Sequence, residues 1–273
     1  MKVYAILLLL LNLNLSASSQ NAKNDTSVVY KKIGNLSLTM KIINPQLVEG
    51  KKNYPCVIFF FGGGWINGNP EQFRKHANHF ARKGLVCFLV DYRVKSRQGT
   101  TPFESLKDAK SAIRFVRENA HKFHVIKDSI IAAGGSAGGQ LAAAAALIDG
   151  YNESTDDLSV SAKPDALILF NPVIDNGPGG YGFERIGNEY KKFSPLHNIH
   201  KGAPPTIIFL GTKDKLVPVE TAQYYKKVME KVGSRCNLIL YPGAGHGFFN
   251  KEEYVEKTLS EADQFLISLG YIK

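Results

Sequence analysis

The middle of the chain carries a serine with a glycine two residues to either side, Gly134, Ser136 and Gly138. An apolar run, residues 129–133, precedes this serine and an alanine-rich segment, residues 140–148, follows it, so Ser136 is expected on a tight turn between a strand and a helix. Small neighbours let the strand and helix approach, and the N-terminus of the helix favours developing negative charge. The pattern predicts Ser136 as a nucleophile for acyl transfer, and the alternative is an ordinary glycine-rich turn.

A serine hydroxyl is a poor nucleophile at neutral pH, so it needs an imidazole to take its proton and a carboxylate to fix the tautomer of that imidazole. His246 follows the last apolar run and has only glycine and alanine close by, which lets its ring reach another loop. Asp214 stands just beyond the preceding apolar run, residues 206–210. We predict His246 as the base and Asp214 as the acid. Asp175, then Glu220, and a purely structural turn at Asp214 are the alternatives.

Three consecutive glycines, residues 62–64, follow another apolar run, residues 55–61. A carbonyl under attack becomes an oxyanion, which backbone N–H groups stabilise, and glycines let those amides turn inward without side chains in the way. A phosphate-cradling loop is disfavoured because no Lys-Ser or Lys-Thr follows. Trp65, the only tryptophan, is next to the glycines, and we expect it either to form a substrate-binding pocket wall or to belong to the core.

The elements that must position these residues follow from hydrophobic periodicity. Alternating apolar residues at positions 36, 38, 40 and 42 predict a strand with one buried face, whereas later unbroken apolar runs predict parallel strands covered on both faces. These strands are expected at residues 55–61, 85–90, 129–133, 166–170, 206–210 and 238–241, and helices at residues 71–83, 103–121, 140–148, 219–232 and 252–269. This alternation predicts an α/β fold with a mostly parallel sheet, helices on both faces and a site beyond the carboxyl ends of the strands.

One long stretch, residues 171–202, shows no regular period and is rich in Gly, Pro, Tyr and Lys. A loop of this length in a compact domain is usually a lid or a binding loop.

Length and composition favour one exported globular domain. The chain has 273 residues, of which 44% are hydrophobic and 21% charged. Residues 1–19 have the charged start, leucine-rich run and small residues of a secretory signal peptide, so residues 20–273 are expected as a single secreted or periplasmic domain. The apolar run holds two asparagines and is shorter than the roughly 20 residues that span a bilayer, so no stable membrane insertion is expected after processing.

The formal net charge is +10, and its lysines and arginines are dispersed rather than gathered in an aromatic-interleaved stripe. Nucleic-acid binding is therefore not expected, although an acidic surface or polysaccharide stays an alternative. Cys56, Cys87 and Cys236 lie in or beside apolar runs, which favours buried free thiols, with one disulfide as the alternative. His-x-x-His pairs occur at positions 76/79, 121/124 and 197/200. None brings a third ligand of convincing spacing, so no metal or other cofactor is expected.

In content and order these motifs resemble the esterases and lipases of the α/β-hydrolase superfamily, especially the hormone-sensitive-lipase-like and acetyl- or feruloyl-esterase groups. The likeness covers roughly residues 50–270 and rests on FGGGWINGNP, DYR, GGSAGGQLA, LGTKDKLVP and PGAGHGF. It implies an eight-stranded sheet with a small cap or none, and the chain order nucleophile, acid, histidine. That order favours Asp214 and His246 and disfavours His197 and His200, which precede the acid.

The resemblance also assigns the oxyanion hole to the amides of Gly63, Gly64 and Ala137. It further implies that Asp91 of the DYR motif is structural and braces the loop through Arg93. The family usually has His before the three glycines, where this chain has Phe61. This difference removes a polar side chain that commonly braces the loop.

The resemblance implies a secreted serine carboxylesterase that acts by Ser-His-Asp acyl transfer. Its expected substrates are short-chain or aromatic acyl esters, such as acetyl or feruloyl groups on polysaccharides, with small-molecule esters as the alternative. A serine peptidase of the same fold and a non-catalytic binding protein are the competing hypotheses; the chain is too short for the propeller domain of many such peptidases. The sequence gives no indication of oligomeric state.

Overall fold

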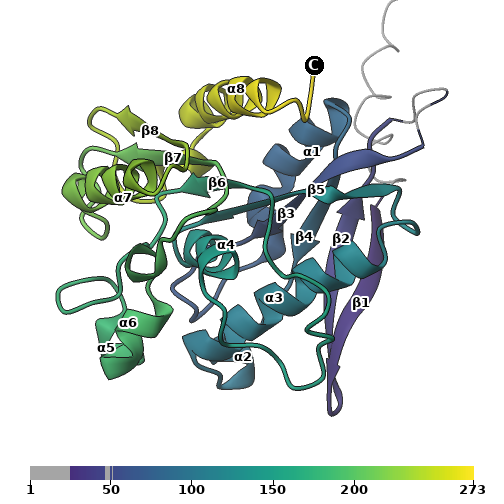
Figure 1. The fold of residues 1–273 in the computed structure, drawn as a ribbon, viewed down its shortest axis with the longest axis horizontal. Helices are drawn as coiled ribbons and strands as arrows, with labels where there is room; N and C mark the ends of the chain where they lie inside the picture. Colours follow the sequence, from purple (N-terminus) through teal and green to yellow (C-terminus); the bar gives the residue numbers. More distant parts are fainter. Residues whose placement is uncertain (1–24, 47–49, 51) are drawn as a thin grey trace, which may run out of the picture.

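A single sheet crosses the part of the chain that the computed structural model describes, residues 25–46, 50 and 52–273 (Figure 1). Its eight strands are β1 (Asp25–Ile33), β2 (Leu36–Ile43), β3 (Tyr54–Phe60), β4 (Val86–Val90), β5 (Val125–Gly135), β6 (Ala166–Phe170), β7 (Thr206–Gly211) and β8 (Cys236–Tyr241), in the order β1-β2-β4-β3-β5-β6-β7-β8. The β1–β2 and β2–β4 pairs are antiparallel and the other five are parallel. The predicted signal peptide, residues 1–19, lies outside the described residues.

Helices cover both faces of the sheet, as predicted (Figure 1). The α-helices are α1 (Arg74–Arg82), α2 (Lys95–Gln98), α3 (Pro102–Glu118), α4 (Ala137–Leu147), α5 (Phe183–Ile186), α6 (Tyr190–Phe193), α7 (Val219–Lys231) and α8 (Glu252–Ser268). Short 3-10 helices are η1 (Pro70–Phe73), η2 (Gly187–Glu189), η3 (Pro195–Asn198) and η4 (Phe248–Asn250). The apolar cluster on one face includes α3, α4 and α7, and the cluster on the other includes α1 and α8.

The central strands are apolar without interruption because both of their faces are buried. In β3, Cys56 and Ile58 belong to the cluster with α3 and α4, whereas Val57 and Phe59 belong to the cluster with α1 and α8. Side chains alternate across a strand, so each cluster takes every second residue of the run. The interpretation of these central runs as doubly covered parallel strands is confirmed, whereas the run at residues 238–241 lies in the edge strand β8 and is only half-buried.

The first strand, β1, was not predicted. Its sequence, DTSVVYKKI, mixes polar and apolar residues because β1 is an edge strand with several exposed positions, and its register with β2 shifts between Val29 and Lys31. A strand that is bulged and half solvated shows no clean period of two.

Within residues 171–202, residues 183–198 form short helices, and residues 171–182 are irregular as predicted (Figure 1, green). The segment is fastened to the molecule at Phe193, whose carbonyl accepts a hydrogen bond from Gln140 Nε2 of α4 at 3.2 Å. The buried Phe193 ring also packs edge-on against Phe103 and Trp65. No larger cap is present in the described residues.

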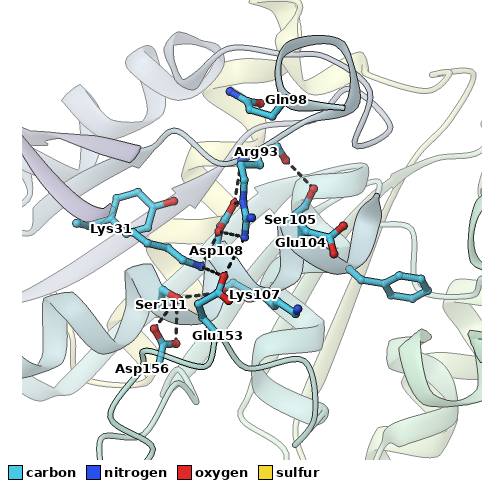
Figure 2. A network of polar contacts seen from close by, with 12 residues as sticks. Lys31, Arg93, Gln98, Glu104, Ser105, Lys107, Asp108, Ser111, Glu153 and Asp156 are labelled. Atoms are coloured by element: carbon cyan, nitrogen blue, oxygen red, sulfur yellow. Dashed lines mark hydrogen bonds and ion pairs between the residues drawn. The ribbon is translucent and has the colours of Figure 1, made fainter. Parts of the chain in front are cut away.

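A buried network of charges joins segments that are far apart in the sequence (Figure 2). At its centre is Asp108 of α3, whose side chain is fully buried and binds Lys31 of β1 at 2.7 Å and Arg93 Nε at 2.8 Å. Glu153 contacts the same two cations at 2.9 and 3.1 Å. Burial alone raises the pKa of Glu153, but the hydrogen bond and charge of Lys31, together with the charge of Arg93, lower it overall. The network ties β1, the segment after β4 and the loop after α4 to one helix.

The expected partnership of Asp91 with Arg93 is wrong. Asp91 binds Arg97 instead, at 2.6 and 2.9 Å, whereas Arg93 turns inward to Asp108. The physical reason is that the fully buried carboxylate of Asp108 needs several donors, and the backbone N–H and guanidinium of Arg93 both supply them.

The Asp108→Asn variant is expected to lower the free energy of unfolding by about 3 to 5 kcal/mol, because it leaves two buried cations with one carboxylate. Urea unfolding of wild type and variant measures this loss. Glu118→Gln, which removes an exposed carboxylate at the end of the same helix, is the matched control and should change stability little. Equal effects of the two substitutions would contradict the structural role of the network.

Candidate active site

Ser136 connects β5 to α4 through a strained turn. Its backbone angles, φ 53° and ψ −118°, lie in a region that non-glycine residues rarely adopt, and such strain typically costs about 1 to 3 kcal/mol. A Cβ at Gly134 would collide with the carbonyl of Gly138, and one at Gly138 would collide with the carbonyl of Phe60. The glycines at this spacing are therefore required by the close approach of strand and helix.

His246 links the serine to a carboxylate. Its Nε2 lies 2.8 Å from Ser136 Oγ, and its Nδ1 lies 2.8 Å from Asp214 Oδ2. The other oxygen of Asp214 accepts hydrogen bonds from the backbone N–H groups of Leu216 at 2.8 Å and Val217 at 3.0 Å. The carboxylate is thus fixed and its side chain is fully buried, while His246 stays partly exposed. A proton on Nδ1 satisfies Asp214 and leaves the lone pair of Nε2 facing the serine hydroxyl.

The alternative acids and bases lie elsewhere. Asp175 accepts a hydrogen bond from Gly177 N and is 3.8 Å from His197, and Glu220 is exposed in the first turn of α7. His200 contacts the carbonyl of Asn198. Within the described residues, the imidazole that contacts Ser136 is that of His246.

The amides expected to form the oxyanion hole are free of protein acceptors. Among the described residues, no carbonyl or side chain accepts a hydrogen bond from the N–H of Gly63, Gly64 or Ala137. The glycine loop starts beside the nucleophile, since a Cβ at Gly62 would be 3.4 Å from Ser136 Cβ. Ala137 is the first residue of α4, where backbone N–H groups are unpaired by geometry. All three amides can therefore donate to a bound group.

Phe61, which stands where the similar enzymes usually have His, is held by a different contact. Its ring stacks on Tyr92 with 4.0 Å between ring centroids and 13° between planes, and Tyr92 Oη donates to the carbonyl of Phe61 at 2.6 Å. Tyr92 immediately precedes Arg93, so the buried network around Asp108 anchors this brace.

Backbone contacts hold the rest of the glycine loop. The amide of Gly62 donates to Gln72 Oε1 at 2.6 Å. The carbonyls of Trp65 and Ile66 accept from the N–H groups of Lys95 and Ser96 at 3.0 and 2.8 Å. Contacts with η1 and with the segment that follows β4 therefore hold the loop in a chain that has Phe61 before the glycines.

Trp65 is 1% exposed and lies in the core. Its Nε1 donates to Gln140 Oε1 at 3.3 Å, and its ring packs against Tyr181 and Phe193. This position corresponds to the core alternative for Trp65; a wall of a substrate pocket would need a more exposed ring. These contacts of the indole anchor the end of the glycine loop in the core.

Arg185 of α5 holds the same loop from the other side. Its Nη1 donates to the carbonyl of Gly64 at 2.6 Å, and its guanidinium lies over the rings of Trp65 and Tyr181, 5.6 and 5.0 Å from their centroids. The hydrogen bonds to Tyr181 and Glu184 outweigh burial and raise the pKa of Arg185, so the group stays charged. The segment 171–202 therefore contributes a fixed charge to the site.

On the ester hydrolysis that the sequence predicts, Arg185→Ala is expected to lower kcat about 10- to 100-fold, because displacement of the glycine loop would misalign the amides that are expected to bind the oxyanion. Steady-state kinetics check this prediction. Arg235→Ala removes an arginine that directly precedes β8 and stacks on Phe265 of α8, and it should leave kcat within about threefold of wild type. An unchanged kcat in Arg185→Ala would separate Arg185 from the loop.

The remaining candidate ligands are dispersed. Among the described residues no three His, Cys, Asp or Glu side chains gather in a possible metal site. His76 is buried between aromatic rings without a hydrogen-bond partner, and burial lowers its pKa to about 3. The three cysteines are buried and free, as predicted. No helix of the described residues combines the length and apolar character needed to cross a membrane.

Sequence reasoning missed Asn171, Gln140 and Arg185. Asn171 had a usable signal, because it is the first residue beyond the apolar run of β6. Its side chain contacts both His246 and Gly247. Gln140 and Arg185 had no comparable signal, since their contacts depend on how the segment 171–202 packs.

The chain matches two protein-family models and is similar to known esterases. Residues 40–178, just over half of the 273 residues, match the family model described as BD-FAE, and residues 168–269 match the dienelactone hydrolase family. Esterase LipC of Mycobacterium tuberculosis is 29% identical over 72% of this chain, and an acetylxylan esterase of Xylanibacter ruminicola is 28% identical over 68% of it. The chain spans only 54% and 39% of the lengths of these two relatives.

The similarity to solved structures covers a larger share of both chains than the similarity to these relatives does. Thermogutta terrifontis esterase 2, phosphoramylated by tabun, is 41% identical with a TM-score of 0.87, covering 92% of this chain and 96% of its own. The same esterase has been solved phosphorylated by paraoxon, with propionate bound and with butyrate bound. The similarity extends over nearly the whole length of both chains.

Proposed function

This chain belongs to the BD-FAE family of α/β-hydrolase serine esterases, and we propose that it hydrolyses carboxylic esters with Ser136 as nucleophile, His246 as base and Asp214 as the orienting carboxylate. One observation carries the proposal: Ser136 Oγ and Asp214 Oδ2 lie on opposite nitrogens of one imidazole, each at 2.8 Å. That arrangement suits proton transfer from a hydroxyl to a base whose tautomer is fixed.

The reaction has two steps. His246 Nε2 takes the proton of Ser136 as Oγ bonds to the ester carbonyl carbon, and the N–H groups of Gly63, Gly64 and Ala137 stabilise the oxyanion. The oxyanion then collapses, the bond to the alcohol oxygen breaks, and the alcohol leaves with the proton from His246. Water repeats the sequence on the acyl-enzyme, which releases the carboxylic acid and restores Ser136.

We propose short-chain or aromatic acyl esters as the substrates, including acetyl or feruloyl groups carried by polysaccharides. Propionate and butyrate are bound in structures of the similar esterase 2, and one relative is an acetylxylan esterase. The small cover formed by residues 171–202 is compatible with an ester that is attached to a polymer. We also propose export, on the sequence pattern of residues 1–19.

A panel of esters tests the function. Acetyl, propionyl, butyryl, octanoyl and feruloyl esters and acetylated xylan are assayed with wild type and Ser136→Ala, alongside peptide substrates. The proposal expects cleavage of short-chain esters that is lost in Ser136→Ala. Peptide turnover without ester turnover would favour a peptidase, and no turnover of any substrate would favour a binding protein.

A further inference from the structure

Asn171 lies next to the reacting groups in an unusual backbone conformation. It directly follows β6, is fully buried, and has a φ of +35°. Its backbone N–H donates to the carbonyl of Phe209 in β7 at 2.7 Å. Asparagine tolerates this left-handed region better than most residues, and such strain tends to occur at functional sites.

The orientation of the Asn171 amide is fixed by its neighbours. The backbone N–H of Gly247 lies 3.2 Å from Oδ1, and a backbone N–H can only donate, so the oxygen must face it. The amide nitrogen Nδ2 is then directed at His246 Nε2, at 3.3 Å. One side chain therefore holds both His246 and the residue after it.

This contact places two donors on one nitrogen. Nε2 of the resting His246 has a single lone pair, which faces the hydroxyl of Ser136 at 2.8 Å, and Asn171 Nδ2–H approaches the same atom. When Nε2 carries a proton it becomes a donor itself, and the contact with Asn171 then joins two donors. The amide thus disfavours a proton on Nε2 in the resting site.

We propose that Asn171 is a positioning residue that keeps His246 in its proton-accepting form and so sets the acid limb of the pH profile. The inference rests on the proposed acyl transfer at Ser136. Among charged side chains of the described residues, only Asp214, on the loop after β7, contacts His246; the other contacts come from the neutral Ser136 and Asn171.

Two variants separate positioning from packing. Asn171→Gly removes the amide while allowing the positive φ without strain. Asn171→Asp keeps the shape and an oxygen for Gly247, but replaces the donor that faces Nε2 with an acceptor. In the kcat/KM profile, the acid limb should move to higher pH by about one unit in the glycine variant, since one neutral contact is lost. It should move by about 1 to 3 units in the aspartate variant, since a negative charge is added.

Titration of the His246 ring by ¹H–¹⁵N NMR gives the same readout without turnover. A protein that cleaves no ester would therefore refute the proposed function and leave this test intact. Thermal melts of both variants report folding, and the aspartate variant serves if the glycine variant does not fold. The inference is overturned if the NMR midpoint and acid limb of Asn171→Gly match those of wild type, or, should that variant not fold, if those of Asn171→Asp do. A fall in kcat alone would show a packing role.

Discussion

Ser136→Ala should lower kcat for a short-chain ester by roughly 10⁴- to 10⁶-fold, the range seen when a serine hydrolase loses its nucleophile. The reason is the single hydroxyl at 2.8 Å from His246 Nε2, which alanine cannot replace. KM should change little, because the substitution leaves the backbone N–H groups proposed to form the oxyanion hole and the surrounding surface intact.

Steady-state assays at high enzyme concentration measure the residual rate of ester cleavage by Ser136→Ala. Ser154→Ala, at an exposed serine in the loop after α4, is the matched control and should match wild type. A Ser136→Ala enzyme within tenfold of wild type would mean that another group attacks the ester.

Asp214→Asn should lower kcat by about 10⁴-fold with little effect on folding. Leu216 N and Val217 N both donate to Oδ1, so the oxygen of the new amide would stay with them and its NH₂ would face His246 Nδ1. The imidazole would then accept at Nδ1 and carry its proton on Nε2. That proton would face Ser136, and the base could no longer accept the hydroxyl proton.

The other candidate acid provides the control for this prediction. Asp175→Asn removes a carboxylate that binds Gly177 N and lies near His197, away from His246. Its kcat should stay within about threefold of wild type. A larger loss in Asp175→Asn than in Asp214→Asn would reverse the assignment of the acid.

The sheet was largely predictable because its central strands are buried on both faces. The run at residues 166–170 coincides with β6, and the helices at 219–232 and 252–269 are one residue longer than α7 and α8. β1 was not predicted because an exposed edge strand does not need apolar residues at every second position. The predicted contact between Arg93 and Asp91 was wrong. The actual partner of Arg93, Asp108, lies on a helix face that sequence spacing does not connect with the segment after β4.

The residues placed at strand ends were also accessible from sequence. Ser136, Asp214 and His246 follow separate apolar runs, and parallel strands bring their carboxyl ends to one edge. Asn171 stands at the same edge, as the first residue of the predicted lid or binding loop 171–202, but its contact with His246 depends on its rotamer and on a positive φ. Support of the glycine loop by Tyr92 and Arg185 depends on tertiary packing that no local pattern records.

Mass spectrometry of the protein after treatment with paraoxon is the sharpest test of Ser136 as the nucleophile, because this reagent phosphorylates the similar esterase 2. We predict one diethylphosphoryl group per chain, located on the peptide that contains Ser136 and absent from Ser136→Ala. An unmodified protein, or a group on another residue that persists in Ser136→Ala, would contradict the assignment of Ser136 as the nucleophile.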